Sequence, residues 1–133
     1  MAGVKEIWPA VLEKAVAMLD GGYNAIAHGG NPVLAMETLT GRTATYLSPA
    51  SISAALLQSL VAAGDMITFD TLNKSGLAGG LVGSHAYMFE KLTVTNGVAM
   101  VQLGNPWGFA QPAAIPLTQL RQNFAEIDVG HPT

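Results

Sequence analysis

The 133-residue sequence contains no cysteine, and that absence excludes several kinds of chemistry. The chain forms no disulfide, offers no thiolate to a metal and supplies no cysteine nucleophile. Charge is also scarce, because six Lys and Arg stand beside nine Asp and Glu, and charged residues make up 11% of the chain. A net charge of −3 with no basic run does not predict a nucleic-acid partner.

Long hydrophobic runs are missing as well. Residues 1–6 have neither the basic nor the apolar region of a secretory signal. The apolar stretch at residues 54–63 is interrupted by Gln58 and Ser59 and is far shorter than a membrane span. The sequence therefore predicts no membrane segment. Its compartment stays unknown, with the cytoplasm as the default.

The residues that are present predict one folded unit. Half of them are apolar, and the length is enough to bury one hydrophobic core. We therefore expect a single subdomain over residues 1–133, without internal repeats. An apolar surface that this composition leaves exposed would suit a partner or self-association.

Helical spacing dominates the first part of the chain. A stripe of apolar residues predicts a helix over residues 8–20, with Pro9 in its first turn. Asn31-Pro32 opens a second helix that Gly41 closes, and residues 42–47 alternate as a short strand does. Ser48 or Ser51 is expected to cap a third helix, which ends at Gly64.

The second part is mostly β. Strands are predicted at residues 66–69, 81–95 and 98–103, and Asn96-Gly97 is typical of a tight hairpin turn between the last two. A short helix at residues 117–124 and a strand at residues 127–129 complete the chain. Helices followed by an antiparallel sheet give the α+β class.

Common catalytic patterns are weak. His28, His85 and His131 lie in unrelated segments without metal-ligand spacing, so no metal site and no cofactor are predicted. The glycine-rich stretch at residues 76–83 lacks the lysine of a phosphate-binding loop. Ser84 is not in a G-x-S-x-G elbow.

Two motifs stand on the arms of the predicted hairpin, His85-Ala86-Tyr87 and Asn105-Pro106-Trp107-Gly108. Four further fragments precede them in order: Trp8-Pro9-Ala10-Val11-Leu12-Glu13-Lys14-Ala15, Gly21-Gly22-Tyr23, Gly29-Gly30 and Leu39-Thr40-Gly41. This ordered series resembles the second half of the calpain-like cysteine peptidases, and it covers nearly the whole chain.

The resemblance implies the His/Asn half of a papain-like fold. By motif, His85 would be the catalytic base, Asn105 would orient its ring, and Trp107 would shield the contact between them. The cysteine would lie on an N-terminal peptidase subdomain, in the same precursor or a separate chain, and the substrate would be a polypeptide. Animal calpains bind calcium partly through acidic residues after this motif, but residues 109–116 contain none, so no calcium site is expected in that loop.

The hairpin register raises an objection. Regular pairing around Asn96-Gly97 would place Asn105 opposite Met88 and on the other side of the sheet from His85. Either a β-bulge shifts one arm, or the chain leaves the strand at Gly104. We favour the exit at Gly104, because Pro106 stops a strand.

Three hypotheses are open at this point. The chain is the His/Asn subdomain of a calpain-like endopeptidase and is inactive alone, or it is a non-catalytic module that binds a polypeptide through the former inter-subdomain face. The third hypothesis is a self-contained hydrolase that uses Ser84 or Thr93, although no motif places either residue. A cysteine-bearing companion would separate the first two.

Overall fold

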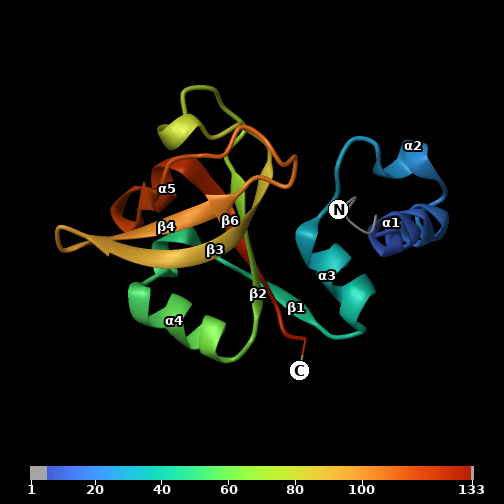
Figure 1. The fold of residues 1–133 in the computed structure, drawn as a ribbon, viewed down its shortest axis with the longest axis horizontal. Coiled ribbons are helices and arrows are strands. Elements are labelled where there is room, and N and C mark those ends of the chain that lie inside the picture. Colours follow the sequence, from blue (N-terminus) through green and yellow to red (C-terminus); the bar gives the residue numbers. More distant parts are fainter. Residues whose placement is uncertain (1–5, 133) are drawn as a thin grey trace, which may run out of the picture. The chain divides into compact units, whose positions relative to one another are not determined.

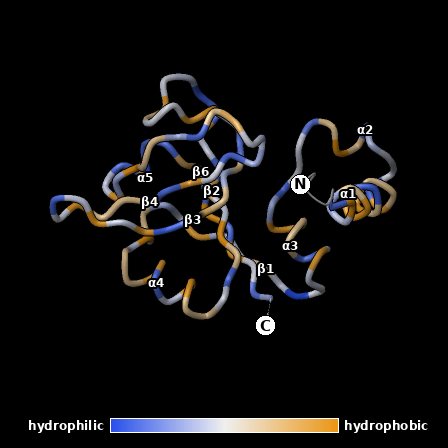
Figure 2. The backbone as a smooth tube through the Cα atoms, viewed as in Figure 1, coloured by the Kyte–Doolittle hydropathy of each residue, from blue (hydrophilic) through white to orange (hydrophobic). Residues whose placement is uncertain are grey.

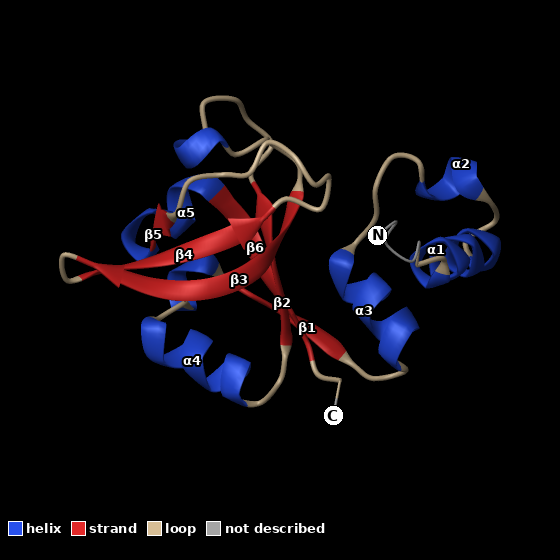
Figure 3. Ribbon diagram, in the orientation of Figure 1, coloured by secondary structure: helices blue, strands red, loops and turns tan. Residues whose placement is uncertain are grey.

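The computed structural model describes residues 6–132. Residues 1–5, which begin the segment tested for a secretory signal, and residue 133 lie outside the described part. The chain divides into two compact units, Met1–Asn31 and Pro32–Thr133, and each is considered by itself. Figure 1 shows the elements of both units, and Figure 3 distinguishes their helices from their strands.

The first unit contains two helices, α1 (Trp8–Leu19) and α2 (Tyr23–Ile26). The first confirms the helix predicted from the apolar stripe, and Pro9 lies in its first turn as expected. Ala17 is its one buried residue within the described part of the chain, whereas Met18 and Leu19 are exposed. Figure 2 shows hydrophobic residues along this helix.

The second unit begins with α3 (Pro32–Thr40), which starts at the predicted proline. The next helix, α4 (Ala54–Ala62), is capped by Ser53, whose hydroxyl accepts a hydrogen bond from the Leu56 amide. The prediction that Ser48 or Ser51 caps it is wrong. Ser48 instead caps a separate 3-10 turn at Pro49–Ser51, so the helix begins only after the extended residue that follows this turn.

Six strands form one antiparallel sheet in the order β1-β6-β2-β3-β4-β5. Their bounds are β1 (Ala44–Leu47), β2 (Met66–Thr71), β3 (Ala86–Thr95), β4 (Val98–Gly104), β5 (Ile115–Pro116) and β6 (Phe124–Gly130). The α+β prediction is confirmed, although β1 precedes α4 in the chain.

Several predicted boundaries are wrong. The strands expected at residues 66–69 and 127–129 are longer, because β2 extends to Thr71 and β6 begins at Phe124. The strand expected from residue 81 begins at Ala86, because Ser84 adopts a φ of +52° that interrupts an extended chain. The helix expected over residues 117–124 is a 3-10 turn at Leu117–Gln119 followed by α5 (Leu120–Asn123). Phe124 already belongs to β6, where its ring packs edge-to-face on Phe69 with the centroids 5.3 Å apart.

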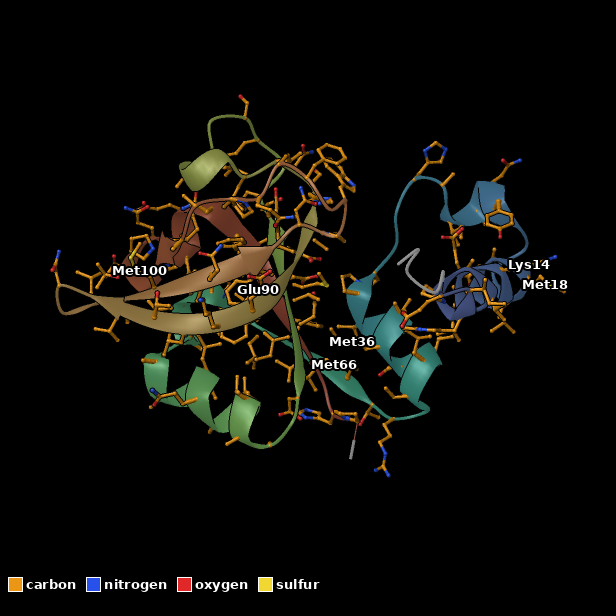
Figure 4. All side chains as sticks on the ribbon, viewed as in Figure 1. Lys14, Met18, Met36, Met66, Glu90 and Met100 are labelled. Atoms are coloured by element: carbon orange, nitrogen blue, oxygen red, sulfur yellow. The ribbon has the colours of Figure 1, made fainter. Side chains whose placement is uncertain are left out.

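The main hydrophobic core lies on one face of the sheet. Phe69 and Tyr87 point into it from β2 and β3, and Leu57 of α4 and Leu120 of α5 are fully buried against them. On the other face α3 packs against β1 and β6. A Cβ on Gly130 would lie 2.8 Å from Met36 Sδ and 2.9 Å from Met66 Cε, and these two methionines lie side by side in Figure 4.

Among residues 6–132, no helix has both the length and the apolar character needed to cross a membrane.

Candidate active site

His85 directly precedes β3 and is fixed to the end of β2 through its main chain. The Thr71 amide donates to the His85 carbonyl at 3.0 Å, and the His85 amide donates to Thr71 Oγ1 at 2.9 Å. The Thr71 hydroxyl in turn donates to the Val82 carbonyl at 2.7 Å. Because Thr71 is only 5% exposed, these bonds hold the start of β3 in a largely water-free setting.

The hairpin that carries the two motifs has the predicted turn. Asn96 and Gly97 both have positive φ, 51° and 77°, as a type I′ turn requires. Met88 pairs with Gly104 and Phe89 with Leu103, but the register shifts between Phe89 and Lys91. A β-bulge at residue 90 is therefore present, and β4 also ends at Gly104. The favoured exit from the strand is confirmed, and the alternative of a bulge occurs as well.

The bulge and the glycine fit one another. Glu90 Oε1 lies 2.5 Å from the position that a Cβ on Gly104 would occupy, so the Glu90 side chain folds over this glycine. Figure 4 labels Glu90 on β3 beside β4. Beyond Gly104 the chain no longer pairs with β3, and this departure from the strand brings the Asn105 side chain to His85.

Asn105 contacts the imidazole directly. His85 Nε2 and Asn105 Oδ1 are 3.0 Å apart. The amide orientation follows from its other contacts, because Asn105 Nδ2 donates to the Ala110 carbonyl at 3.2 Å and Oδ1 accepts from the Trp107 amide at 3.1 Å. An oxygen facing Nε2 requires that nitrogen to carry the proton, which leaves Nδ1 of the neutral ring as the base.

Gln111 holds the main chain of Asn105 on both sides. The Asn105 amide donates to Gln111 Oε1 at 2.7 Å, and Gln111 Nε2 donates to the Asn105 carbonyl at 3.2 Å. Asn105 is 3% exposed, so its polar groups depend on these partners. The sequence analysis missed Gln111, because a glutamine in a proline-punctuated loop carries no recognisable signal.

Aromatic rings surround His85 on two sides. The Trp107 ring lies with its centroid 4.3 Å from that of His85, and the Tyr87 ring meets His85 edge-on at 4.8 Å. Trp107 is 50% exposed and stacks with Phe109 at 5.7 Å. Apolar rings beside a hydrogen bond exclude water and so strengthen it.

Other histidines and hydroxyls lie elsewhere. His28 is exposed in the first unit, and His131 Nδ1 contacts the Asp65 carboxylate at 2.9 Å. Ser84 is exposed with positive φ, and its amide donates to the Leu72 carbonyl. The structure therefore brings together His85, Asn105 and Trp107 from the sequence prediction. Among the described residues, no hydrogen bond joins the Ser84 hydroxyl or another histidine to the His85 ring.

Three carboxylates on β2 and β6 form a second cluster that sequence patterns did not indicate: Asp70, Glu126 and Asp128. Burial, reinforced by the negative charges of Asp128 and Glu126, raises the pKa of Asp70 to about 7. Burial also raises the pKa of Asp128. Only the alternation of Glu126 and Asp128 along one strand could have hinted at this cluster, and nothing in the sequence connects them with Asp70.

Comparison with known proteins gives the family. Residues 2–113 match the family described as calpain family cysteine protease. The chain belongs to the calpain family. Calpain-9 from Rattus norvegicus is 33% identical over 117 residues, which cover 77% of this chain and 17% of that protein. Calpain clp-4 from Caenorhabditis elegans is 34% identical over 116 residues, covering 77% of this chain and 16% of that protein.

These matches confirm the resemblance to calpain-like cysteine peptidases. Calpain-13 from Rattus norvegicus is similar to the same extent, 33% identical over 118 residues, with 80% of this chain and 18% of that protein covered. The chain thus spans about one sixth of the length of the calpains it matches, and it contains none of the cysteine that names the family.

Proposed function

We propose that this chain is the His/Asn subdomain of a calpain-like cysteine endopeptidase, with His85 as the general base and Asn105 as its orienting partner. The observation that carries the proposal is the contact between His85 Nε2 and Asn105 Oδ1 at 3.0 Å. It holds the proton on Nε2 and leaves Nδ1 to receive a proton from a thiol. Among the described residues, no hydrogen bond to Nδ1 competes for this role.

The nucleophile must come from outside these 133 residues, on a cysteine-bearing N-terminal subdomain of the same precursor or a separate chain. His85 Nδ1 takes the thiol proton, and the thiolate attacks the carbonyl carbon of a peptide bond. His85 then returns the proton to the departing amine, which leaves an acyl-enzyme that water hydrolyses. Without the thiol the isolated chain is expected to be inactive.

Trp107 shields the pair from water in this mechanism. Its ring lies against the His85 imidazole, and its main-chain amide donates to the same Asn105 oxygen that faces Nε2. One residue thus contributes both a cover and a second hydrogen bond that fixes the amide.

The first test uses the chain joined to the cysteine-bearing segment from its own source. Hydrolysis of casein is measured for the assembly with His85→Ala, Asn105→Ala and the exposed control His28→Ala. Loss of a general base lowers the rate by about 10²–10⁴-fold, so we expect His85→Ala to fall by that amount. Asn105→Ala should fall less, and His28→Ala should equal the unmodified assembly.

Either of two results contradicts the proposal. Full activity in His85→Ala would show that His85 is not the general base. Hydrolysis by the isolated chain that is abolished by Ser84→Ala would point to a self-contained serine hydrolase. An assembly that binds polypeptides but cleaves none would support the alternative, a pseudo-peptidase module. The exposed rings of Trp107 and Phe109 beside the site are the observation that favours this second candidate.

A further inference from the structure

A side-chain hydroxyl joins the end of β2 to the start of β3. The last paired residues of these two strands are Asp70 and Ala86, so the same register places Thr71 opposite the next residue, His85. At a hydrogen-bonded position of a regular antiparallel pair, opposite residues exchange two amide-to-carbonyl bonds. Here the Thr71 amide donates to the His85 carbonyl at 3.0 Å, but the His85 amide donates to Thr71 Oγ1 at 2.9 Å. The threonine hydroxyl thus takes the place of a main-chain carbonyl.

The backbone departs from regular pairing on both sides of this contact. The register of β2 with β6 shifts between Asp70 and Thr71, and such an irregularity turns the side chain that follows it. Ahead of β3, Ser84 has a φ of +52°, which interrupts the extended chain directly before His85. His85 therefore lies where regular strand pairing has not yet begun, and the bond to the hydroxyl supplies part of the missing support.

The Thr71 hydroxyl both donates and accepts at this place. It carries one hydrogen, which the Val82 carbonyl receives at 2.7 Å, with the His85 carbonyl also within reach at 3.0 Å. Its lone pair accepts the His85 amide. Because Thr71 is 5% exposed, water has little access to replace these bonds if the hydroxyl is lost. The backbone on both sides of Ser84 thus depends on one hydroxyl group.

The position of the imidazole depends on this support. Asn105 Oδ1 faces the ring at Nε2, the nitrogen far from the main chain, at 3.0 Å. The other end of the side chain is the Cα of His85, whose amide and carbonyl both bond to Thr71. The place of a ring follows from its Cα position and its rotamer. Thr71 therefore fixes where the ring starts, and Asn105 fixes where it ends.

We propose that Thr71 is a positioning residue for His85, and that its hydroxyl, rather than the shape of its side chain, carries this role. The inference rests on the proposed function, in which His85 is the general base. Thr71 acts through the main chain of His85 and not through contact with substrate. A displacement of about 1 Å in a reacting group can lower the rate by about 10²-fold, so a small shift of His85 is enough to matter.

Two substitutions separate the hydroxyl from the shape of the side chain. Thr71→Val keeps the β-branched shape and removes the hydroxyl, whereas Thr71→Ser keeps the hydroxyl and removes a methyl group. Thr40→Val is the matched control, because the Thr40 hydroxyl also donates to a carbonyl, that of Met36 at 2.7 Å, and accepts an amide, that of Arg42 at 3.2 Å. Thr40 ends α3, which packs against β1 and β6.

The first measurement is nitrogen NMR of the His85 ring in the 133-residue chain, which requires no cysteine. In the unmodified chain, Thr71→Ser and Thr40→Val, the proton of the neutral ring should stay on Nε2 and exchange slowly with water. In Thr71→Val the ring no longer meets Asn105 squarely, so the Nε2 proton signal should be lost to exchange. A folded Thr71→Val that keeps this signal unchanged overturns the proposal.

The second measurement is casein hydrolysis by the chain joined to its cysteine-bearing segment. Because Thr71 holds the base and not the substrate, Thr71→Val should lower kcat by about 10²-fold and leave KM nearly unchanged. Thr71→Ser should recover most of that loss, and Thr40→Val should equal the unmodified assembly. An equal loss in Thr71→Ser would assign the effect to packing of the methyl group, and an equal loss in Thr40→Val would assign it to stability alone. Either result overturns the proposal.

The outcomes separate this proposal from the proposed function. Full activity in His85→Ala removes the peptidase role and with it the role of Thr71. Loss of activity in His85→Ala together with full activity in a folded Thr71→Val removes only the role of Thr71.

A third measurement covers the case in which Thr71→Val does not fold. In the unmodified chain the hydroxyl proton of Thr71 should exchange slowly with water and show a nuclear Overhauser effect to the His85 amide proton. Thr71→Ser should show the same contact and retain activity. A hydroxyl proton that exchanges freely, or an inactive but folded Thr71→Ser, overturns the proposal without the valine variant.

Discussion

The Gln111 side chain bonds both main-chain groups of Asn105, accepting from its amide at 2.7 Å and donating to its carbonyl at 3.2 Å. Asn105 contacts His85 after the chain has left β4 at Gly104. At that position no hydrogen bonds to a neighbouring strand hold its main chain. The glutamine amide replaces those lost bonds. The orientation of the imidazole therefore depends on a residue six positions further along the loop.

Replacing Gln111 tests this dependence. In Gln111→Ala the buried amide of Asn105 loses its acceptor, which costs about 1–3 kcal/mol of unfolding free energy. Nitrogen NMR of His85 should also show the proton distributed over both ring nitrogens rather than held on Nε2. Gln58→Ala, an exposed glutamine on α4, is the control and should change neither property. An unchanged His85 spectrum in a folded Gln111→Ala would contradict the assignment.

The buried hydroxyl of Tyr87 provides a second prediction. It accepts the Val82 amide at 2.9 Å and so helps to hold the loop that leads to His85. Tyr87→Phe leaves that amide without its acceptor and should lower the free energy of unfolding by about 1–3 kcal/mol. Urea denaturation measures the change. Tyr46→Phe removes a hydroxyl from a ring that is 69% exposed and should cost almost nothing.

Gly83 should resist substitution for a steric reason. A Cβ there would collide with the Lys74 carbonyl oxygen and would lie 3.2 Å from that of Leu72, both of which are backbone atoms. Gly83→Ala is therefore expected to destabilise the fold by about 1–3 kcal/mol. Gly30→Ala meets nothing within 4 Å and serves as the control in the same thermal-unfolding measurement. Equal stability of the two variants would show that the backbone around Lys74 and Leu72 moves to accommodate the added methyl group at little cost.

The stability of the chain should depend on pH through Asp70. Burial, followed by the charges of Asp128 and Glu126, raises the pKa of its carboxyl from 3.8 to about 7 in the folded state. Between these values the folded state binds more protons than the unfolded state, so its stability falls as pH rises and the loss is complete above about 7.

Asp70→Asn should remove the part of this dependence that comes from Asp70 and leave the part that comes from Asp128, whose pKa burial also raises. We expect the variant to gain stability relative to the unmodified chain as pH rises from 5 to 8, when urea denaturation is carried out in EDTA to exclude metal. Glu13→Gln, the exposed control, should track the unmodified chain at every pH. A difference between Asp70→Asn and the unmodified chain that stays constant with pH would mean that Asp70 is already ionised in the folded state.

Much of the fold was predictable because the relevant signals are local. The apolar stripe of α1, the proline that opens α3 and the turn at Asn96-Gly97 depend on neighbouring residues and on backbone preferences, and the structure confirms all three. The boundaries that failed depend on distant contacts. Phe124 continues a helical pattern in the sequence, yet it belongs to β6 because its ring packs on Phe69 of β2.

The candidate site divides in the same way. The sequence by itself determined the residue types, His85 and Asn105 within two motifs and the complete absence of cysteine, and through the motifs it indicated the calpain family. Only the tertiary structure decided that the two side chains meet, because the contact depends on the bulge at residue 90 and the end of β4 at Gly104. Neither Gln111 nor the meeting of Asp70 with Asp128 could be predicted, since strand register and loop closure join residues that have no relation along the chain.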